Sequence, residues 1–159
     1  MSKAPTKNFI IDFDSTFTQV EALDILGEIA LKDAPDRDDS LQKIKDITDQ
    51  GMEGGLSFRE SLDQRLALLK ANKRHIEPLI AALKQKVTKS FIRNSDFLRS
   101  YNEHIFIVSN GFKEFIAPIV TEYGVKEEHV FANTFLFDAE ENIVGFDETN
   151  VLSANNGKA

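Results

Sequence analysis

The chain has 159 residues without Cys or Trp, and its 19 Lys and Arg against 26 Asp and Glu give a formal net charge of −7. Apolar residues make up 42% and charged residues 28%, which is typical of a globular domain with one core. The acidic balance argues against nucleic-acid binding, and the lack of Cys excludes disulfides and thiolate metal sites. The apolar stretch at 9–13 is too short for a signal peptide or a membrane span, so we expect a cytoplasmic, soluble protein.

The first predicted element is a short strand at 8–13, Asn-Phe-Ile-Ile-Asp-Phe. An apolar run on consecutive positions is typical of a parallel-sheet strand that is covered on both faces. Asp12-Phe13-Asp14-Ser15-Thr16 stands at its end, where open α/β sheets place their ligand crevice. Asp12 and Asp14 are therefore candidates for chemistry, and the alternative is a turn in which Asp14 or Ser15 caps the next helix.

Four amphipathic segments come next, and their apolar spacing predicts a small bundle of helices inserted after the first strand. They are expected at 20–32, 39–50, 58–69 and 73–87. The third begins with a capping box of Ser57 and Glu60, after a break at 51–55. A further short helix is expected around 94–101.

A second apolar strand at 105–108 ends at Ser109-Asn110-Gly111, which is expected to open a helix that ends at Gly124. A hydroxyl beside free backbone N–H groups at a helix start can hold an anion, although Asn-Gly also favours a plain turn. A third strand is expected at 130–137, followed by a hairpin return at 143–146. Two strand ends then have complementary roles, because one supplies carboxylates and the other supplies anion donors.

These motifs resemble those of the haloacid dehalogenase-like phosphatases. Asp-Phe-Asp-Ser-Thr at 12–16, Ser-Asn-Gly-Phe at 109–112 and Lys158 are similar to the first three motifs of that family. The segment from Met52 to Arg65, with the pattern M-E-G…F-x-E-S-L-x-x-R, and Phe-Ala-Asn at 131–133 resemble the phosphoserine phosphatase subfamily. The likeness extends from Phe9 to Lys158, nearly the whole chain.

The resemblance implies an Mg²⁺-dependent hydrolase that acts on phosphoserine, in the last step of serine biosynthesis, through an aspartyl-phosphate intermediate. It implies that Asp12 is the nucleophile and Asp14 the general acid and base. Asp12 would coordinate the metal through its carboxylate and Asp14 through its backbone carbonyl. It also assigns roles in substrate binding to a second set of residues. The phosphate would be held by Ser109, Asn110, Gly111 and Lys158. The amino and carboxylate ends of the substrate would be bound by Glu21 and Arg65, and the walls of the pocket would be formed by Met52 and Phe58.

The implied fold is a Rossmann-like parallel α/β sheet with an inserted helical cap. The boundaries that follow are 1–18 and 88–159 for the α/β core and 19–87 for the cap. The family has a fourth, acidic motif that the sequence to Ala159 lacks, so we expect a C-terminally truncated chain with an incomplete sheet and weak or no activity. The first strand would then have an uncovered apolar edge, through which the chain could self-associate.

Three alternatives stay open at this point. The chain could act on another small phosphomonoester, or it could be a non-catalytic homologue that binds a partner through its sheet edge. Glu21 and Arg65 could also be ordinary solvated residues on helix faces, as most charged side chains are. Neither nucleic acid nor a membrane is expected as a partner.

Overall fold

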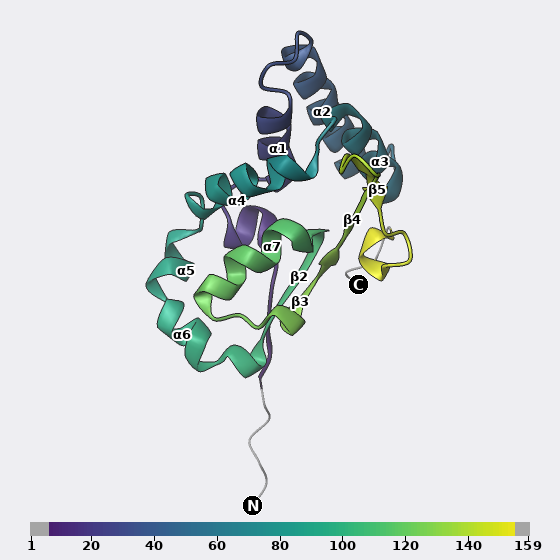
Figure 1. Cartoon of the computed structure of the whole chain (residues 1–159). Helices are drawn as coiled ribbons and strands as arrows, with labels where there is room; N and C mark the ends of the chain where they lie inside the picture. The colour runs from purple at the N-terminus through teal and green to yellow at the C-terminus, as the bar shows by residue number, and fades with distance from the viewer. Residues whose placement is uncertain (1–6, 155–159) are drawn as a thin grey trace, which may run out of the picture.

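The computed structural model describes residues 7–154, and within them helices and strands alternate as in an α/β protein (Figure 1). The α-helices are α1 (Ala22–Ala30), α2 (Arg37–Met52), α3 (Phe58–Leu69), α4 (Ile76–Lys84), α5 (Lys89–Arg93), α6 (Ser95–Ser100) and α7 (Lys113–Val120). The strands are β1 (Phe9–Ile11), β2 (Ile105–Phe112), β3 (Val130–Asn133), β4 (Phe135–Phe137) and β5 (Ile143–Phe146). The predicted fold class, a parallel α/β sheet with substantial helix, is confirmed.

The parallel sheet has the strand order β1-β2-β3. Phe9 pairs with Ile105 and Ile11 with Ile107, so β1 and β2 run in register to their carboxyl ends. Helix α7 packs against one face through buried Phe115, Ile116 and Ile119. Because both strands end at the same edge, Asp12 and Ser109 emerge side by side there, as open α/β sheets place their functional residues.

The first strand is shorter and more exposed than the sequence predicts. It ends at Ile11 rather than Phe13, and Ile10 is 72% exposed and Phe9 41% exposed. The expectation that it is covered on both faces is therefore wrong within residues 7–154, because β2 is its one strand partner there and no described helix covers Ile10. The expected uncovered apolar edge is present in this part of the chain.

The third predicted strand is interrupted at Thr134. Its first half, β3, pairs with β2, whereas β4 turns away and forms an antiparallel hairpin with β5. The break is fixed by Glu114 of α7, whose Oε1 accepts a hydrogen bond of 2.8 Å from the Phe135 N–H. The hairpin with 143–146 is confirmed, but the prediction of one continuous strand over 130–137 is wrong.

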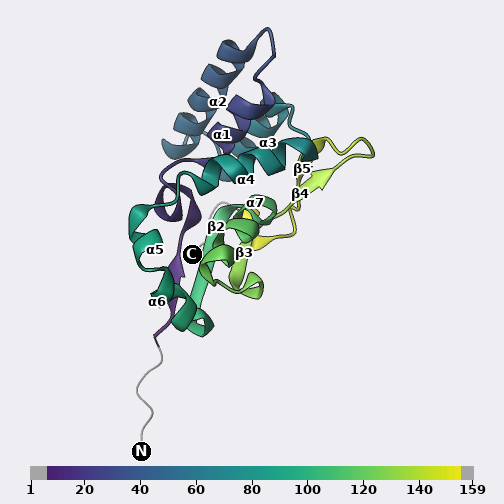
Figure 2. The same cartoon turned by 60° about the vertical axis from the view of Figure 1, so that its left-hand side comes forward.

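The helices α1 to α4 gather beyond the carboxyl end of the sheet (Figures 1 and 2). The predicted capping box is confirmed, since Ser57 Oγ accepts from the Glu60 N–H and Glu60 Oε2 accepts from the Ser57 N–H. The fourth predicted helix begins with a single tight turn at Lys73–His75 before α4. The short helix expected around 94–101 is α6, and α5 precedes it as a helix that the sequence did not predict. The division into core and cap units stays a prediction.

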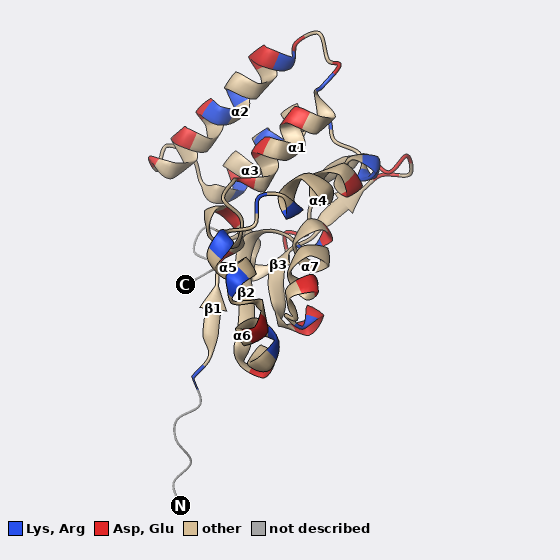
Figure 3. Cartoon of the chain, turned by 90° about the vertical axis from the view of Figure 1, so that its left-hand side faces the viewer, with Lys and Arg blue, Asp and Glu red and all other residues tan. Residues whose placement is uncertain are grey.

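Charged residues of both signs alternate along the exposed face of α2 (Figure 3). None of the helices between residues 7 and 154 combines the length and the apolar character that crossing a bilayer requires. The expected location in the cytoplasm stays a prediction.

Candidate active site

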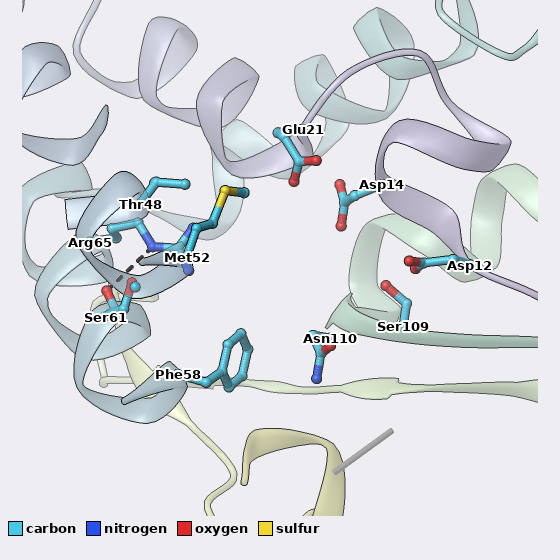
Figure 4. Close-up of a pocket in the computed structure, with 11 residues that line it drawn as sticks. Asp12, Asp14, Glu21, Thr48, Met52, Phe58, Ser61, Arg65, Ser109 and Asn110 are labelled. Carbon is cyan, nitrogen blue, oxygen red and sulfur yellow. Dashed lines mark hydrogen bonds between the residues drawn. The ribbon is translucent and has the colours of Figure 1, made fainter. Parts of the chain in front are cut away.

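A cavity of about 270 Å³ lies between the carboxyl end of the sheet and the helices α1 to α3 (Figure 4). Its lining residues come from four separate stretches of the chain. They are Asp12, Asp14, Glu21, Thr48, Gly51, Met52, Phe58, Ser61, Arg65, Ser109 and Asn110. Eight of the nine described residues that the sequence proposed for the site line this cavity, and Gly111 is the one that does not.

Asp12 leaves the sheet at the end of β1 and points into the cavity (Figure 4). Its Oδ1 accepts a hydrogen bond of 2.7 Å from the Phe13 N–H, which fixes the carboxylate at the start of a tight turn, Phe13–Phe17. Ser15 in this turn has a φ of 55°, a left-handed conformation that is uncommon for residues other than glycine. Such local strain is typical of segments that hold functional groups. Phe13 and Phe17 anchor the turn in the core.

Asp14 faces the same space, two residues further along the turn. Its Oδ1 accepts a hydrogen bond of 2.8 Å from the Ala22 N–H at the first turn of α1. This contact places a carboxylate at the positive end of a helix dipole, where a negative charge is favoured. The same turn is joined to the start of α1 a second time, because Ser15 Oγ donates to Glu21 Oε1 at 2.6 Å. The nucleophile candidate and the helical side are therefore connected through a few residues.

Ser109 approaches Asp12 from the neighbouring strand, and its side chain points toward that carboxylate (Figure 4). The residue is 1% exposed, and its Oγ accepts a hydrogen bond of 2.9 Å from the Gly111 N–H. Because the oxygen is used as an acceptor, the hydroxyl hydrogen remains to be donated to an anion in the cavity. Gly111 does not line the cavity, so its N–H orients Ser109 rather than facing a ligand directly.

The segment 109–111 does not open a helix as the sequence predicts. It continues β2 to Phe112, and α7 begins at Lys113. The strand conformation persists because Asn133 of β3 pairs with the end of β2 and donates a side-chain hydrogen bond of 2.9 Å to the Asn110 carbonyl oxygen. The anion donors are therefore held by strand pairing and side-chain contacts.

Arg65 of α3 forms the opposite wall. Its Nε donates to the Ser61 carbonyl oxygen at 3.3 Å, which directs the guanidinium along the helix toward the cavity (Figure 4). Burial lowers the pKa of Arg65, while the nearby carboxylates of Asp24, Glu21 and Asp14 raise it. The group remains a cation at neutral pH, because guanidinium is protonated under all ordinary conditions.

Asp24 is the acidic neighbour that the sequence did not single out. Its pKa is raised, first by burial and then by the charge of Glu21, while Arg65 opposes the shift. Glu21 and Asp24 together balance the arginine on the helical side. A ligand with both an ammonium and a carboxylate group would meet an opposite charge for each.

Met52 and Phe58 also line the cavity, and Met52 is 76% exposed. Sequence reasoning missed Thr48, Gly51 and Ser61. The helical period contains the signal for two of them, because Thr48 precedes Met52 by four residues and Ser61 precedes Arg65 by four. Gly51 is required by close packing, since a Cβ atom there would lie 3.0 Å from Ser61 Oγ.

The Asp12 carboxylate fits a magnesium ion whose other ligands come mainly from phosphate and water. Among residues 7–154 no group of three or more His, Asp or Glu side chains forms a closed metal cage. Mg²⁺ is commonly bound by one or two carboxylates together with phosphate oxygens and water. Asp12 supplies such a carboxylate in this cavity, and the resemblance assigns the Asp14 backbone carbonyl to the same ion.

One predicted ligand cannot be placed. Lys158, expected to hold the phosphate, lies outside the described residues 7–154. The last described turn before Lys158 is Val151–Ser153. This turn is bonded to the site, because Asn110 Nδ2 donates to the Leu152 carbonyl oxygen at 2.8 Å.

The chain is similar to several known proteins, although no protein-family model matches it. The phosphoserine phosphatase of Bos taurus is 28% identical over 148 residues, which cover 92% of this chain and 62% of that protein. The phosphoserine phosphatase of Streptococcus thermophilus is 32% identical over 126 residues, or 78% of this chain and 53% of that protein. The chain therefore spans less than two thirds of these curated relatives.

A solved structure gives a longer match. It is the crystal structure of a phosphoserine phosphohydrolase-like protein from Francisella tularensis, with a TM-score of 0.79 and 30% identity. The match covers 94% of this chain and 68% of that one. The similarity therefore includes both the sheet and the helical side of the cavity.

Proposed function

Because this chain belongs to the haloacid dehalogenase-like phosphatases, in the phosphoserine phosphatase subfamily, we propose that its cavity binds and hydrolyses a small phosphomonoester. The observation that carries the proposal is one cavity with two chemically different walls. The sheet side presents Asp12, Asp14 and Ser109, and the helical side presents Arg65 and Glu21. This arrangement suits a ligand with a phosphate at one end and a charged amino-acid group at the other.

Asp12 is the nucleophile in this proposal. One carboxylate oxygen attacks phosphorus, the bond from phosphorus to the substrate oxygen breaks, and an aspartyl phosphate forms. Asp14 donates a proton to the leaving oxygen. It then takes a proton from the water that attacks the aspartyl phosphate, which releases inorganic phosphate and restores Asp12. Ser109 donates its hydroxyl to a phosphate oxygen, and the resemblance assigns another oxygen to Lys158.

Electrostatic repulsion is the main obstacle to this attack. A phosphomonoester carries about −1.5 to −2 charges, and two like unit charges ~4 Å apart repel by roughly 4 kcal/mol at an effective dielectric constant of 20. The Asp12 carboxylate and the Asp14 backbone carbonyl would hold Mg²⁺, which would supply positive charge that offsets this repulsion. The Ala22 N–H at the α1 N-terminus holds Asp14 in the cavity, beside the proposed nucleophile.

Phosphoserine is the substrate that the helical wall favours. A guanidinium can hold a carboxylate with two parallel hydrogen bonds, which an ammonium cannot do. Glu21 lies at the top of the same cavity, where it can accept from the substrate amino group (Figure 4). We place this reaction, as the resemblance does, at the last step of serine biosynthesis.

Release of inorganic phosphate from phosphoserine with Mg²⁺ tests the activity. The chain is expected to turn over phosphoserine weakly, and Asp12→Asn is expected to lose this turnover by at least about a thousandfold, because an amide cannot act as this nucleophile. Equal turnover by the two proteins would overturn the proposal.

A substrate panel tests the specificity. Arg65→Ala is expected to lower kcat/KM for phosphoserine by about a hundredfold, the loss of a charged hydrogen-bonded contact. Hydrolysis of phosphoethanolamine, which lacks the carboxylate, is expected to change by less than about threefold. If both substrates suffer alike, the chain acts on another phosphomonoester and Arg65 has a structural role.

The second candidate function is a non-catalytic one, favoured by the exposed edge of β1. Phe9 and Ile10 on this strand are exposed, and an unpaired apolar edge can pair with another chain. Native mass measurement discriminates between the two functions. A 17.9 kDa monomer that hydrolyses phosphoserine contradicts self-association through this edge, whereas an inactive dimer supports it.

A further inference from the structure

Asn133 is a buried side chain that contacts both the strand end that carries Ser109 and the turn Val151–Ser153. It is the last residue of β3 and is 0% exposed. Its Nδ2 donates to the Asn110 carbonyl oxygen at 2.9 Å and to the Leu152 carbonyl oxygen at 3.2 Å. Asn110 belongs to the strand end that carries Ser109, and Leu152 to the turn that leads toward Lys158.

These bonds form a junction of three segments. The Leu152 carbonyl oxygen accepts a second bond, from Asn110 Nδ2 at 2.8 Å, so β2, β3 and the turn Val151–Ser153 meet at two amide side chains. Asn110 lines the cavity and points its amide nitrogen toward the yellow turn in Figure 4. The junction therefore lies directly behind the wall that presents Ser109.

The donor end of Asn133 is fully used, but its acceptor end is not. No described residue donates to the buried Asn133 Oδ1. A buried polar atom without a partner is unfavourable, and an apolar side chain would avoid it. The contribution of Asn133 to the fold therefore comes from the two hydrogen bonds that its Nδ2 donates.

We propose that Asn133 is a positioning residue for the phosphate-binding wall, an inference that rests on the proposed function. By holding the Asn110 carbonyl, Asn133 keeps β2 extended to Phe112, and this keeps Gly111 N–H bonded to Ser109 Oγ. By holding the Leu152 carbonyl, it fixes the start of the segment that continues to Lys158. Asn133 does not line the cavity, so it acts on the anion only through these neighbours.

Binding of inorganic phosphate in the presence of Mg²⁺, measured by titration calorimetry, tests this role. Asn133→Ala removes both donors and is expected to weaken phosphate binding about tenfold, the effect of one lost orienting hydrogen bond. Asn150→Ala is the matched control. Asn150 also ties the turn Val151–Ser153 to β3, through a bond of 2.8 Å to the Ala132 carbonyl oxygen, but it does not contact Asn110.

The control separates positioning from general loosening. Asn150→Ala is expected to change phosphate affinity by less than about threefold. Equal losses in the two variants would overturn the inference, because the turn alone would then explain both. Unchanged affinity in Asn133→Ala would overturn it as well.

A double-mutant cycle with Ser109→Ala measures the coupling between Asn133 and Ser109 in phosphate binding. A purely structural role of Asn133 would give no such coupling. If Asn133 acts through Ser109, Asn133→Ala is expected to lose most of its effect on phosphate binding in the Ser109→Ala background. Additive losses would contradict this route. If the unmodified chain bound no phosphate, the proposed function would fail first, and the inference with it.

Folding is monitored by thermal unfolding of each variant. Asn133→Ser keeps one donor and replaces Asn133→Ala if the alanine variant does not fold. It is expected to bind phosphate with an affinity between that of the unmodified chain and that of Ser109→Ala. Affinity equal to that of the unmodified chain would overturn the inference.

Discussion

Gly111 has little room for a side chain among the residues on the sheet side of the cavity. A Cβ atom at this position would lie 3.1 Å from Asp14 Oδ2, 3.1 Å from Ile116 Cδ1 and 3.2 Å from Ser109 Oγ. Such distances are shorter than ordinary van der Waals contact, so a methyl group would have to move at least one of these atoms. Two of the three belong to proposed active-site residues, which makes this glycine a constraint on chemistry.

Gly111→Ala is therefore expected to lower kcat for phosphoserine by at least about tenfold, because small displacements of reacting groups have large effects on rate. The free energy of unfolding is expected to fall by only about 1–2 kcal/mol, a typical cost of overpacking. Steady-state kinetics and urea unfolding measure the two quantities.

Gly145→Ala is the matched control, because a Cβ atom there would have nothing within 4 Å. It is expected to leave kcat within about twofold of the unmodified chain. A Gly111→Ala variant as active as this control would contradict the close packing of Asp14 and Ser109.

At the scale of elements, helix α7 sets the path of the chain after β3. Glu114 near the start of α7 accepts the Phe135 N–H with Oε1, whereas its buried Oε2 has no partner among the described residues. Burial raises the pKa of Glu114, and hydrogen bonds from the backbone oppose the shift. The charged form is thus held in the fold at some cost in stability.

The sign of the resulting pH dependence follows from proton binding. Between the ordinary pKa of a glutamate, 4.5, and the raised pKa of Glu114 in the folded state, the folded chain binds more protons than the unfolded chain. The free energy of unfolding contributed by this group therefore falls as pH rises through that interval. Glu114→Gln keeps the carbonyl acceptor for Phe135 and removes the titration.

The difference between the unmodified chain and Glu114→Gln in urea unfolding, measured at a series of pH values above 4.5, checks this prediction. As pH rises, the free energy of unfolding of Glu114→Gln is expected to increase relative to that of the unmodified chain. A pH-independent difference would show that Glu114 titrates normally.

The same contact explains one limit of sequence prediction. The helices and the capping box follow from local periodicity and capping residues, so they could be predicted. The break at Thr134 could not, because it depends on Glu114, which lies 21 residues before its partner Phe135 in the chain. Thr48 and Ser61 could have been found, since each lies one helical turn before a residue that the sequence did single out.

At the scale of the whole molecule, Arg59 connects the helical side to the end of the described chain. Its Nη2 donates to the Glu148 carbonyl oxygen at 3.0 Å and to Ser153 Oγ at 2.9 Å. Arg59 lies next to Phe58 on α3, and Ser153 lies in the turn that Asn133 and Asn110 hold from the other side. The Arg59 side chain thus links α3, on the helical side of the cavity, to the turn Val151–Ser153, which is bonded to Asn110 on the sheet side.

Arg59→Ala is expected to lower the free energy of unfolding by about 2 kcal/mol, because hydrogen bonds from charged groups contribute more than neutral ones. The Ser153 and Ala154 amides, which close the turn, are expected to exchange their hydrogens faster. Hydrogen exchange followed by NMR measures the second effect. The exposed Arg93 of α5 provides the control, and equal exchange in Arg59→Ala and Arg93→Ala would contradict the link.

The molecule as a whole agrees with the sequence in architecture and differs from it in the lengths and the surroundings of its strands. The order of a strand, four helices and two further parallel strands could be read from hydrophobic patterns. The exposure of β1 could not be derived from its own residues, because Phe9-Ile10-Ile11 is as apolar as a buried strand. Only the neighbours of a strand decide which of its faces are covered.

The central claim is that both walls of one cavity hold a single amino-acid phosphomonoester. Titration of the ¹⁵N-labelled chain with phosphoserine and Mg²⁺, followed by amide chemical shifts, tests it without requiring turnover. We predict that Ser109, Asn110 and Gly111 on the sheet side and Thr48, Met52 and Ser61 on the helical side shift together, with one common dissociation constant. Shifts confined to one of these walls, or located away from both, would contradict the account.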